Sequence, residues 1–241
     1  MNIIKYGGSR VSVAKDKYDD QFINSLIELV KKYSQQNFMI IIGGGPLNKV
    51  MIEEAKEKNP KITKDELDWI GIKSTWINAE YVLKKFQEAQ VESVCPEIIK
   101  DPTKELSNEY KVYFAGGWKP GWSTDYITML LAKTFQAERV IKVSDFDYVK
   151  DISPLDLQEL SKEERSAKLK EADDLGEVRW QKMVELVGTE WIPRLNTPLD
   201  PLAAKLGLEN AYIALYIGRE EEIDKILSGK EKEFKGTIVR G

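Results

Sequence analysis

Residues 38–45 read FMIIIGGG, five apolar residues followed at once by three glycines. A run of about four to eight β-branched and aromatic residues that ends at glycine is typical of a buried strand. The same arrangement occurs twice more, as IIKYGG at 3–8 and VYFAGG at 112–117. A glycine loop between a strand and a helix directs backbone N–H groups at an anion. Three such loops in one chain therefore indicate a polyphosphate ligand.

Short strands and amphipathic helices alternate along the rest of the chain. A charged segment at 161–174 predicts a solvated helix or loop. The alternation predicts an α/β fold, a three-layer αβα sandwich with a central, mostly parallel sheet covered by helices on both faces. Further strands are expected at 93–95, 139–143, 212–216 and 237–239, and helices at 18–32, 47–58, 65–86, 126–135, 174–187 (with Gly176 leaving its start open) and 220–227.

The composition excludes several classes of mechanism. The 241 residues include no histidine and one cysteine, Cys95. A Ser-His-Asp triad, an imidazole general base, a histidine metal site and a CxxC redox pair are therefore excluded. The net charge of −4 disfavours a nucleic-acid partner, and no apolar run approaches the roughly 20 residues that cross a membrane. Because residues 1–10 also lack the apolar stretch of a signal peptide, we expect a cytoplasmic protein without a membrane partner.

Two common phosphate-binding motifs do not fit the glycine loops. The segment GGWKPGWS at 116–123 has the glycine spacing of a P-loop, but Trp122 stands where the Walker lysine is required. No GxGxxG follows the first predicted strand, so a dinucleotide-binding Rossmann site is also unsupported. The phosphate site must therefore belong to another class.

The whole pattern resembles the amino acid kinase superfamily, and within it the archaeal-type UMP kinases. The resemblance covers essentially the whole chain in the family's order. Its motifs are KYGGS at 5–9, GGGPLNK at 43–49, DELDWIGI at 65–72 with Asn78-Ala79, GGWKPGWSTD at 116–125, SDFDYV at 144–149, DPLAAK at 200–205 and GTI at 236–238. The resemblance implies transfer of the γ-phosphoryl group of ATP to UMP.

The same resemblance implies the other partners of the protein. Mg²⁺ is expected to be held mainly through the nucleotide phosphates, with no metal site made by protein side chains. UMP and ATP are the expected small-molecule partners, and a hexamer built as a trimer of dimers is the expected assembly. Residues 1–136 hold the glycine loops and are interpreted as the acceptor half, and residues 137–241 as the donor half, as two domains or as one continuous domain.

The resemblance assigns the acceptor site to residues of the first half. Asp68 resembles the family acid that binds the ribose hydroxyls, a task that suits a carboxylate because it accepts two hydrogen bonds. Trp118 and Trp122 offer aromatic faces for stacking on a base. We expect Asp125 to cap the helix that follows it. The predicted UMP-binding residues are Gly44, Asp68, Trp118, Gly121, Trp122, Ser123 and Thr124.

The resemblance also assigns catalysis and the donor site. Lys5, at the end of the first strand, is placed to stabilise the transferring phosphoryl group. Asp147 resembles the acid that orients catalytic groups or approaches the metal, and Arg194 resembles a second phosphate-facing cation. The predicted catalytic residues are Lys5 and Asp147, and the predicted ATP-binding residues are Gly8, Ser9, Gly45, Lys49, Ser144, Tyr148, Lys150 and Ser153.

The donor motif departs from the family pattern at three positions. Tyr148 replaces the usual glycine, Lys150 the usual adenine-side tyrosine and Ser153 the usual acid. We expect Tyr148 to supply the missing aromatic surface. Lys49 replaces an arginine, which keeps the charge but loses the bidentate fork.

Two alternative functions remain open. One is a sister kinase that acts on another small acceptor, such as an amino acid, carbamate or an isopentenyl phosphate. The absence of histidine counts against the isopentenyl phosphate kinases, and Asp68 with the 123–125 loop favours a nucleoside monophosphate. The other alternative is a nucleotide-binding sensor or storage protein without turnover, which the altered segment 148–153 keeps open.

Overall fold

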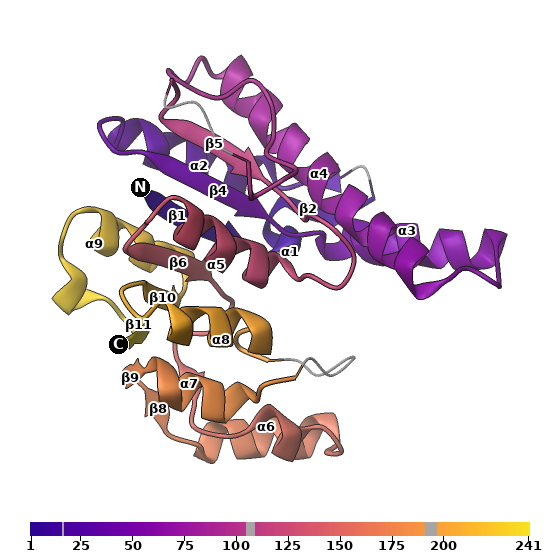
Figure 1. Ribbon diagram of the computed structural model, residues 1–241, viewed down its shortest axis with the longest axis vertical. Coiled ribbons are helices and arrows are strands. Elements are labelled where there is room, and N and C mark those ends of the chain that lie inside the picture. The colour runs from indigo at the N-terminus through magenta and orange to yellow at the C-terminus, as the bar shows by residue number, and fades with distance from the viewer. Residues whose placement is uncertain (16, 105–108, 191–196) are drawn as a thin grey trace.

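A seven-stranded sheet forms the centre of the molecule (Figure 1). The computed structural model describes residues 1–15, 17–104, 109–190 and 197–241. Among these residues every neighbouring pair of central strands is parallel except β10 and β11, as predicted. In sheet order the strands are β5 (Val112–Ala115), β4 (Phe38–Ile42), β1 (Asn2–Tyr6), β6 (Arg139–Val143), β10 (Ala214–Gly218), β11 (Gly236–Arg240) and β9 (Glu177–Arg179).

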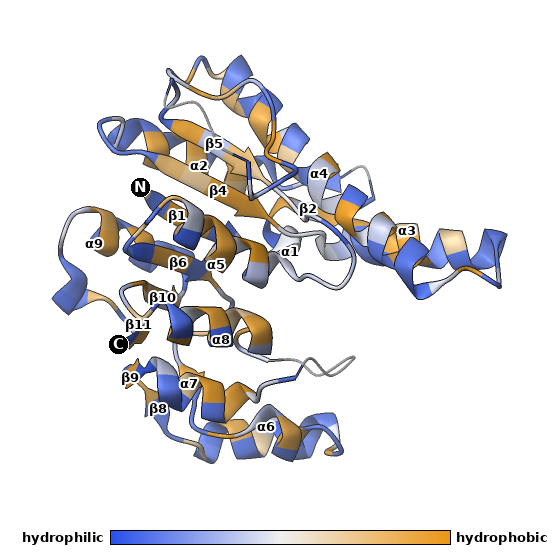
Figure 2. Cartoon of the chain, viewed as in Figure 1, coloured by the Kyte–Doolittle hydropathy of each residue, from blue (hydrophilic) through white to orange (hydrophobic). Residues whose placement is uncertain are grey.

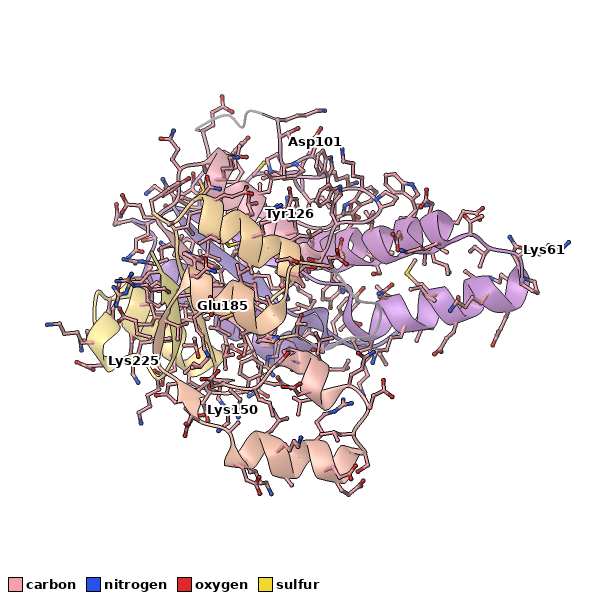
Figure 3. The ribbon with its side chains drawn as sticks, turned by 60° about the horizontal axis from the view of Figure 1, so that its bottom comes forward. Lys61, Asp101, Tyr126, Lys150, Glu185 and Lys225 are labelled. Atoms are coloured by element: carbon pink, nitrogen blue, oxygen red, sulfur yellow. The ribbon has the colours of Figure 1, made fainter. Side chains whose placement is uncertain are left out.

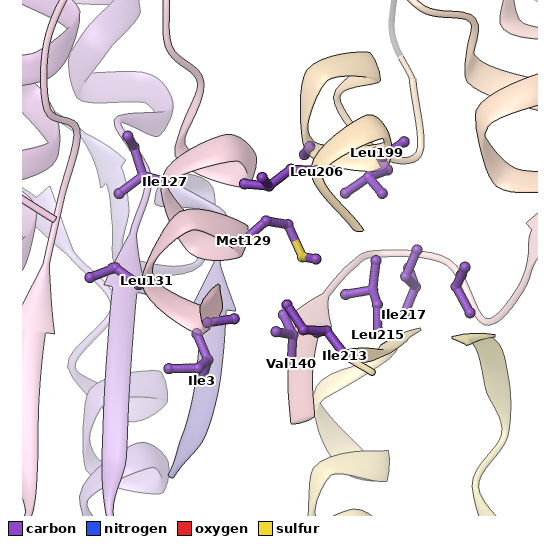
Figure 4. Close-up of a cluster of buried hydrophobic side chains, with 14 of the residues drawn as sticks. Ile3, Ile127, Met129, Leu131, Val140, Leu199, Leu206, Ile213, Leu215 and Ile217 are labelled. Carbon is purple, nitrogen blue, oxygen red and sulfur yellow. The ribbon is translucent and has the colours of Figure 1, made fainter. Parts of the chain in front are cut away.

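Helices cover both faces of this sheet, so the predicted three-layer αβα sandwich is confirmed. Since side chains alternate along a strand, Ile3 of β1 packs into one layer and Ile4 into the other. Figure 4 shows the first layer, where Met129 lies between Leu206 and the strand residue Val140. Helices α5 (Thr124–Thr134), α7 (Trp180–Val187) and α8 (Pro201–Glu209) contribute to that layer, and α2 (Asp20–Lys32), α4 (Lys64–Glu88) and α9 (Ile223–Leu227) to the other.

Two helices, α3 (Gly45–Lys58) and α4, form an arm that projects from the sheet (Figure 1). Lys61 lies at its tip (Figure 3), where the ribbon is largely hydrophilic (Figure 2). Thr63 begins α4 with a capping box that it shares with Glu66. The base of the arm places the loop before α3 beside the middle of α4, where Asn78 lies, at one edge of the sheet. No helix in the described part of the chain is both long and apolar enough to span a membrane.

The charged segment at 161–174 forms a solvated helix, as predicted. α6 (Lys162–Glu171) begins at Ser161 with a second capping box, and none of its described residues is buried. The helix lies at the end of the molecule beyond α7 (Figure 1).

The predicted helix at 174–187 is wrong over residues 174–179. β8 (Asp174–Leu175) pairs with β7 (Val149–Lys150), and β9 pairs with β11, so only residues 180–187 of this stretch are helical. Pairing with strands distant in sequence outweighs the local helical pattern here. The predicted strand at 93–95 is also wrong, because Val94 makes an isolated bridge to Val112 instead of a strand.

The first two glycine loops touch each other at the ends of β1 and β4. A Cβ atom at Gly8 would overlap the backbone nitrogen of Gly45 and the carbonyl oxygen of Gly43. Gly45 also adopts a φ of +57°, which side-chain-bearing residues rarely adopt. Asn78 of α4 donates from Nδ2 to the carbonyl oxygens of Gly43 and Gly44, at 2.9 and 3.0 Å. The close approach of the two loops therefore requires glycine on both sides.

We expect Gly8→Ala to destabilise the fold by about 1–3 kcal/mol, because the overlap is with backbone that must move. Denaturant unfolding measures the difference. Gly176→Ala is the matched control, since no atom lies within 4 Å of a Cβ placed there. Equal unfolding midpoints for the two variants would contradict the proposed contact.

Candidate active site

The carboxyl ends of the parallel strands bring the predicted site residues to one edge of the sheet. β5, β4, β1 and β6 are neighbours and run in the same direction. The loops that follow them begin at Gly116, Gly43, Gly7 and Ser144. Ligands of open α/β sheets bind in the crevice outside this edge. Segments far apart in the sequence therefore meet in one region.

A carboxylate lies between two lysines of adjacent strands. Lys5 of β1 and Lys142 of β6 are partners in the strand register. Asp125, in the first turn of α5, places Oδ1 2.9 Å from Nζ of Lys5 and accepts a hydrogen bond on Oδ2 from Nζ of Lys142. The three side chains are at most 13% exposed. We call these residues the Lys–Asp–Lys cluster.

Burial and charge act in opposite directions on the cluster. Burial by itself raises the pKa of Asp125, but the ammonium groups of Lys142 and Lys5 outweigh it and hold this pKa well below its ordinary value. Burial lowers the pKa of Lys142, and Asp125 opposes that change while Lys5 adds to it. Asp125 therefore supplies the counter-charge for two lysines that lie side by side.

One pocket lies between α4 and the loop after β5. Its volume is about 310 Å³, and Gly44, Asp68 and residues 121–124 line it. The backbone N–H of Gly121 donates to Oδ2 of Asp68 over 3.1 Å. Gly117 is fixed in the same loop because its N–H donates to Oγ1 of Thr75 over 2.7 Å. Six of the seven predicted UMP-binding residues thus come together, and we call this the acceptor pocket.

The seventh, Trp118, lies outside the lining of the acceptor pocket. Its ring contacts the ammonium group of Lys119, with 3.8 Å between Nζ and the ring centroid. Trp122 lines the pocket and stacks on Tyr126 at a centroid distance of 4.2 Å. Trp118 therefore packs against the hydrophobic core in this arrangement, whereas Trp122 lies in the pocket wall.

A larger cavity follows β6. Its volume is about 570 Å³, and it is lined by the segment 145–150, by Arg165 and Leu169 of α6 and by Arg219. Tyr148 and Lys150, two of the predicted ATP-binding residues, belong to this lining. Nζ of Lys150 lies 2.7 Å from a carboxylate oxygen of Asp174, which also lines the cavity. We call this the donor cavity.

The other predicted donor residues do not line this cavity. Ser144 donates to the carbonyl oxygen of Phe146 over 2.7 Å, and Ser153 caps the short helix that follows it. Their hydroxyl groups therefore serve local turns. The remaining four lie around the glycine loops, where Ser9 and Lys49 are exposed: Gly8, Ser9, Gly45 and Lys49. Arg194 lies outside the described residues.

The structure corrects the capping role expected for Asp125, and it places Asp147 apart from Lys5. Asp147 is not part of the Lys–Asp–Lys cluster, because its Oδ1 lies 2.5 Å from Nε of Arg219. Asp125 does not cap α5, since the hydroxyl of Ser123 accepts the capping hydrogen bond from Tyr126. The first turn of α5 points at the strand ends, so a side chain there reaches the lysines. The carboxylate that orients Lys5 is therefore Asp125.

Sequence reasoning missed Lys142, Thr75 and Arg219. Lys142 had a usable signal, because RVIKV at 139–143 carries a lysine within an apolar strand just as IIKY does at 3–6. Thr75 and Arg219 lie in segments without a distinctive pattern. Their positions beside the pockets depend on how the helices and strands pack.

The described residues contain no group of three or more cysteine, aspartate and glutamate side chains that could hold a metal ion. Asp145 and Asp147 both line the donor cavity. Mg²⁺ is commonly bound by one or two carboxylates together with substrate phosphates. These side chains therefore fit an ion that arrives with a nucleotide, and they do not form a cage of their own.

Comparisons with known proteins agree with this geometry. Residues 1–177 match the sequence model of the Amino acid kinase family. Uridylate kinase of Archaeoglobus fulgidus is 28% identical over 241 residues, with 98% of each chain covered. Uridylate kinase of Thermococcus kodakarensis is 28% identical over 242 residues, with 99% of each chain covered. The crystal structure of the A. fulgidus uridylate kinase superposes with a TM-score of 0.73 at 25% identity, covering 99% of each chain.

We expect Asp125→Asn to destabilise the protein by about 3–5 kcal/mol at pH 7, since it leaves two buried lysines without a counter-charge. Glu54→Gln, which breaks the exposed Lys15–Glu54 pair, is the control and should cost much less. Urea unfolding of both variants measures the difference. Similar losses would show that the cluster contributes no more than a surface pair.

The stability that is lost when Asp125 is replaced should also depend on pH. Because the pKa of Asp125 is lower in the folded state, its stabilisation is fully present above the ordinary value of 3.8 and is lost as the pH falls below it. The difference in unfolding free energy between the original protein and Asp125→Asn should therefore be constant down to about pH 5 and shrink below about pH 4.

Proposed function

The chain belongs to the amino acid kinase family, and from that membership we propose that it transfers the γ-phosphoryl group of ATP to UMP. Similarity to archaeal uridylate kinases over nearly the whole length supports the choice of UMP. The observation that carries the proposal is that the Lys–Asp–Lys cluster adjoins lining residues of both cavities along the chain. Asp125 directly follows Thr124 of the acceptor pocket, and Lys142 precedes Asp145 of the donor cavity by three residues.

The transfer needs charge stabilisation more than proton transfer. An oxygen of the UMP phosphate forms a bond to the γ-phosphorus, the bond from that phosphorus to the β–γ bridging oxygen breaks, and UDP and ADP are released. The attacking phosphate oxygen carries no proton that must be removed, which suits a chain without histidine. Lys5 and Lys142 supply positive charge where negative charge develops, and Asp125 positions both ammonium groups.

We assign UMP to the acceptor pocket. Asp68 uses Oδ2 for the N–H of Gly121, which leaves Oδ1 for a ribose hydroxyl. Trp122 offers its face to the uracil ring, and Ser123 and Thr124 lie beside the start of α5, where the helix dipole favours a phosphate. Gly44 and Gly121 let the backbone approach the ligand closely. Trp118 supports the loop from outside.

We assign ATP to the donor cavity and the glycine loops. Tyr148 lines the cavity and is the candidate for stacking on the adenine. Gly8, Ser9, Gly45 and Lys49 lie at the ends of β1 and β4 and are the candidates for the phosphates. Asp145 and Asp147 would hold a Mg²⁺ ion that arrives with the nucleotide, and the ion would neutralise part of the charge of the phosphates.

The remaining expectations follow from the same proposal. The partners are the small molecules UMP and ATP, and the protein acts in the cytoplasm. The assembly is a hexamer made from three dimers. Residues 1–136 bind the acceptor and residues 137–241 bind the donor, although β1 and β6 pair directly and the sheet is continuous across this division.

The purified protein should form ADP from ATP when UMP and Mg²⁺ are present, and more slowly with CMP, AMP or GMP. An assay that couples ADP release to NADH oxidation measures each rate. ADP formation with an amino acid or carbamate but not with UMP would favour a sister kinase. Binding of ATP and UMP without ADP release would favour the sensor, whose basis is the altered residues at 148, 150 and 153.

Asp68→Asn should weaken UMP binding by about tenfold or more and leave ATP binding unchanged, because a charge-assisted hydrogen bond to the ribose is lost. Calorimetric titrations with each nucleotide measure both constants. Asp65→Asn removes the same charge from an exposed position one turn earlier on α4 and serves as the control. Equal weakening of UMP and ATP would remove Asp68 from the acceptor site.

A further inference from the structure

Arg219 lies at the carboxyl end of β10, on the edge of the sheet that carries the site. β10 is parallel to β6, and Gly218 is the register partner of Val143. The N–H of Ser144 donates to the carbonyl oxygen of Gly218 over 2.9 Å. Arg219 is therefore held beside the segment that follows β6, and its side chain lines the donor cavity. None of the sequence motifs includes it.

The guanidinium group of Arg219 retains most of its hydrogen-bonding capacity. Among the described residues it makes one hydrogen bond, from Nε to Asp147. A guanidinium has five N–H donors, so four remain. The two other cations in the described lining are more fully engaged: Lys150 binds Asp174, and Arg165 donates to two backbone carbonyl oxygens.

The ion pair between Arg219 and Asp147 is easily replaced by a ligand. The two side chains are 48% and 61% exposed. Such pairs are stabilised little, because water and salt screen the charges. A phosphate carries more negative charge than a carboxylate and fits the planar fork of a guanidinium. A phosphate that enters the cavity can therefore take the place of Asp147 or join it on Arg219.

The next residue connects Arg219 to the first glycine loop. Oε2 of Glu220 lies 2.6 Å from a terminal nitrogen of Arg10, whose guanidinium also packs over the ring of Phe22. Arg10 directly follows Ser9 in α1 (Gly8–Val11). Arg219 thus lies toward the glycine-loop end of the donor cavity, whereas α6, which lines the cavity through Leu169, lies far from α1 (Figure 1).

We propose that Arg219 binds the β- and γ-phosphates of the donor nucleotide. The inference rests on the proposed function, because it takes ATP as the donor. Without a cation beside them, the carboxylates Asp145, Asp147 and Asp174 of the cavity wall would repel a triphosphate. Arg219 offsets that repulsion at the end of the cavity where the phosphates must lie to reach the Lys–Asp–Lys cluster. The base then lies toward α6.

Calorimetric titrations of the Arg219→Gln variant with ATP, ADP and AMP, in the presence of Mg²⁺, test the proposal. We expect ATP to bind about tenfold more weakly or worse, ADP to be affected less, and AMP by less than about twofold. Arg219→Lys should restore part of the ATP affinity, since it keeps the charge without the fork. Arg240→Gln is the matched control, because Arg240 forms a similar exposed pair with Glu177 at the opposite edge of the sheet.

Equal weakening of all three nucleotides would overturn the proposal, because it would place Arg219 near the base or in the cavity's framework. Unchanged ATP affinity would also overturn it, as would failure of the original protein to bind any adenine nucleotide. The proposed function is judged separately, by UMP-dependent ADP release from the original protein. Loss of ATP affinity in Arg219→Gln without such release would sustain the inference and reject the UMP kinase.

Discussion

The site depends on one carboxylate placed between two lysines. β1 and β6 are adjacent and parallel, so Lys5 and Lys142 lie side by side. The repulsion between their ammonium groups is offset only by a counter-charge that lies near both. Asp125 supplies that charge from the first turn of α5. Because a buried ion pair is costly to break, this contact fixes where α5 begins relative to the strand ends. The acceptor loop, which ends at the cap residue Ser123, is fixed with it.

The walls of the two cavities differ in how closely they are packed and hydrogen-bonded. The acceptor pocket is built on α4 and on a loop that Thr75 and Asp68 bind through backbone N–H groups. The donor cavity is closed on one side by α6, none of whose described residues is buried, and by exposed ion pairs. Fewer packing constraints act on residues there.

Much of the fold was predictable because the central strands are buried on both faces. Such strands need continuous apolar sequence, and FMIII at 38–42 or VYFA at 112–115 has few other interpretations. The edge strands β8 and β9 were not predictable, since they are short and half exposed and form through pairing with β7 and β11. The same holds for Trp118, whose aromatic character does not reveal that Lys119 covers its ring.

The sequence by itself determined the buried strands, the glycine loops after them and, through the absence of histidine, a chemistry that relies on charge instead of imidazole. Each of these is a local property or a property of the composition. The tertiary structure alone decided that Asp125 forms ion pairs with Lys5 and Lys142, and that Asp147 forms one with Arg219. These groups are far apart in the chain and meet because β1, β6 and β10 are neighbours at one edge of the sheet. The order of the strands in the sheet therefore determines which lysine or arginine each carboxylate pairs with, and no local sequence pattern encodes that order.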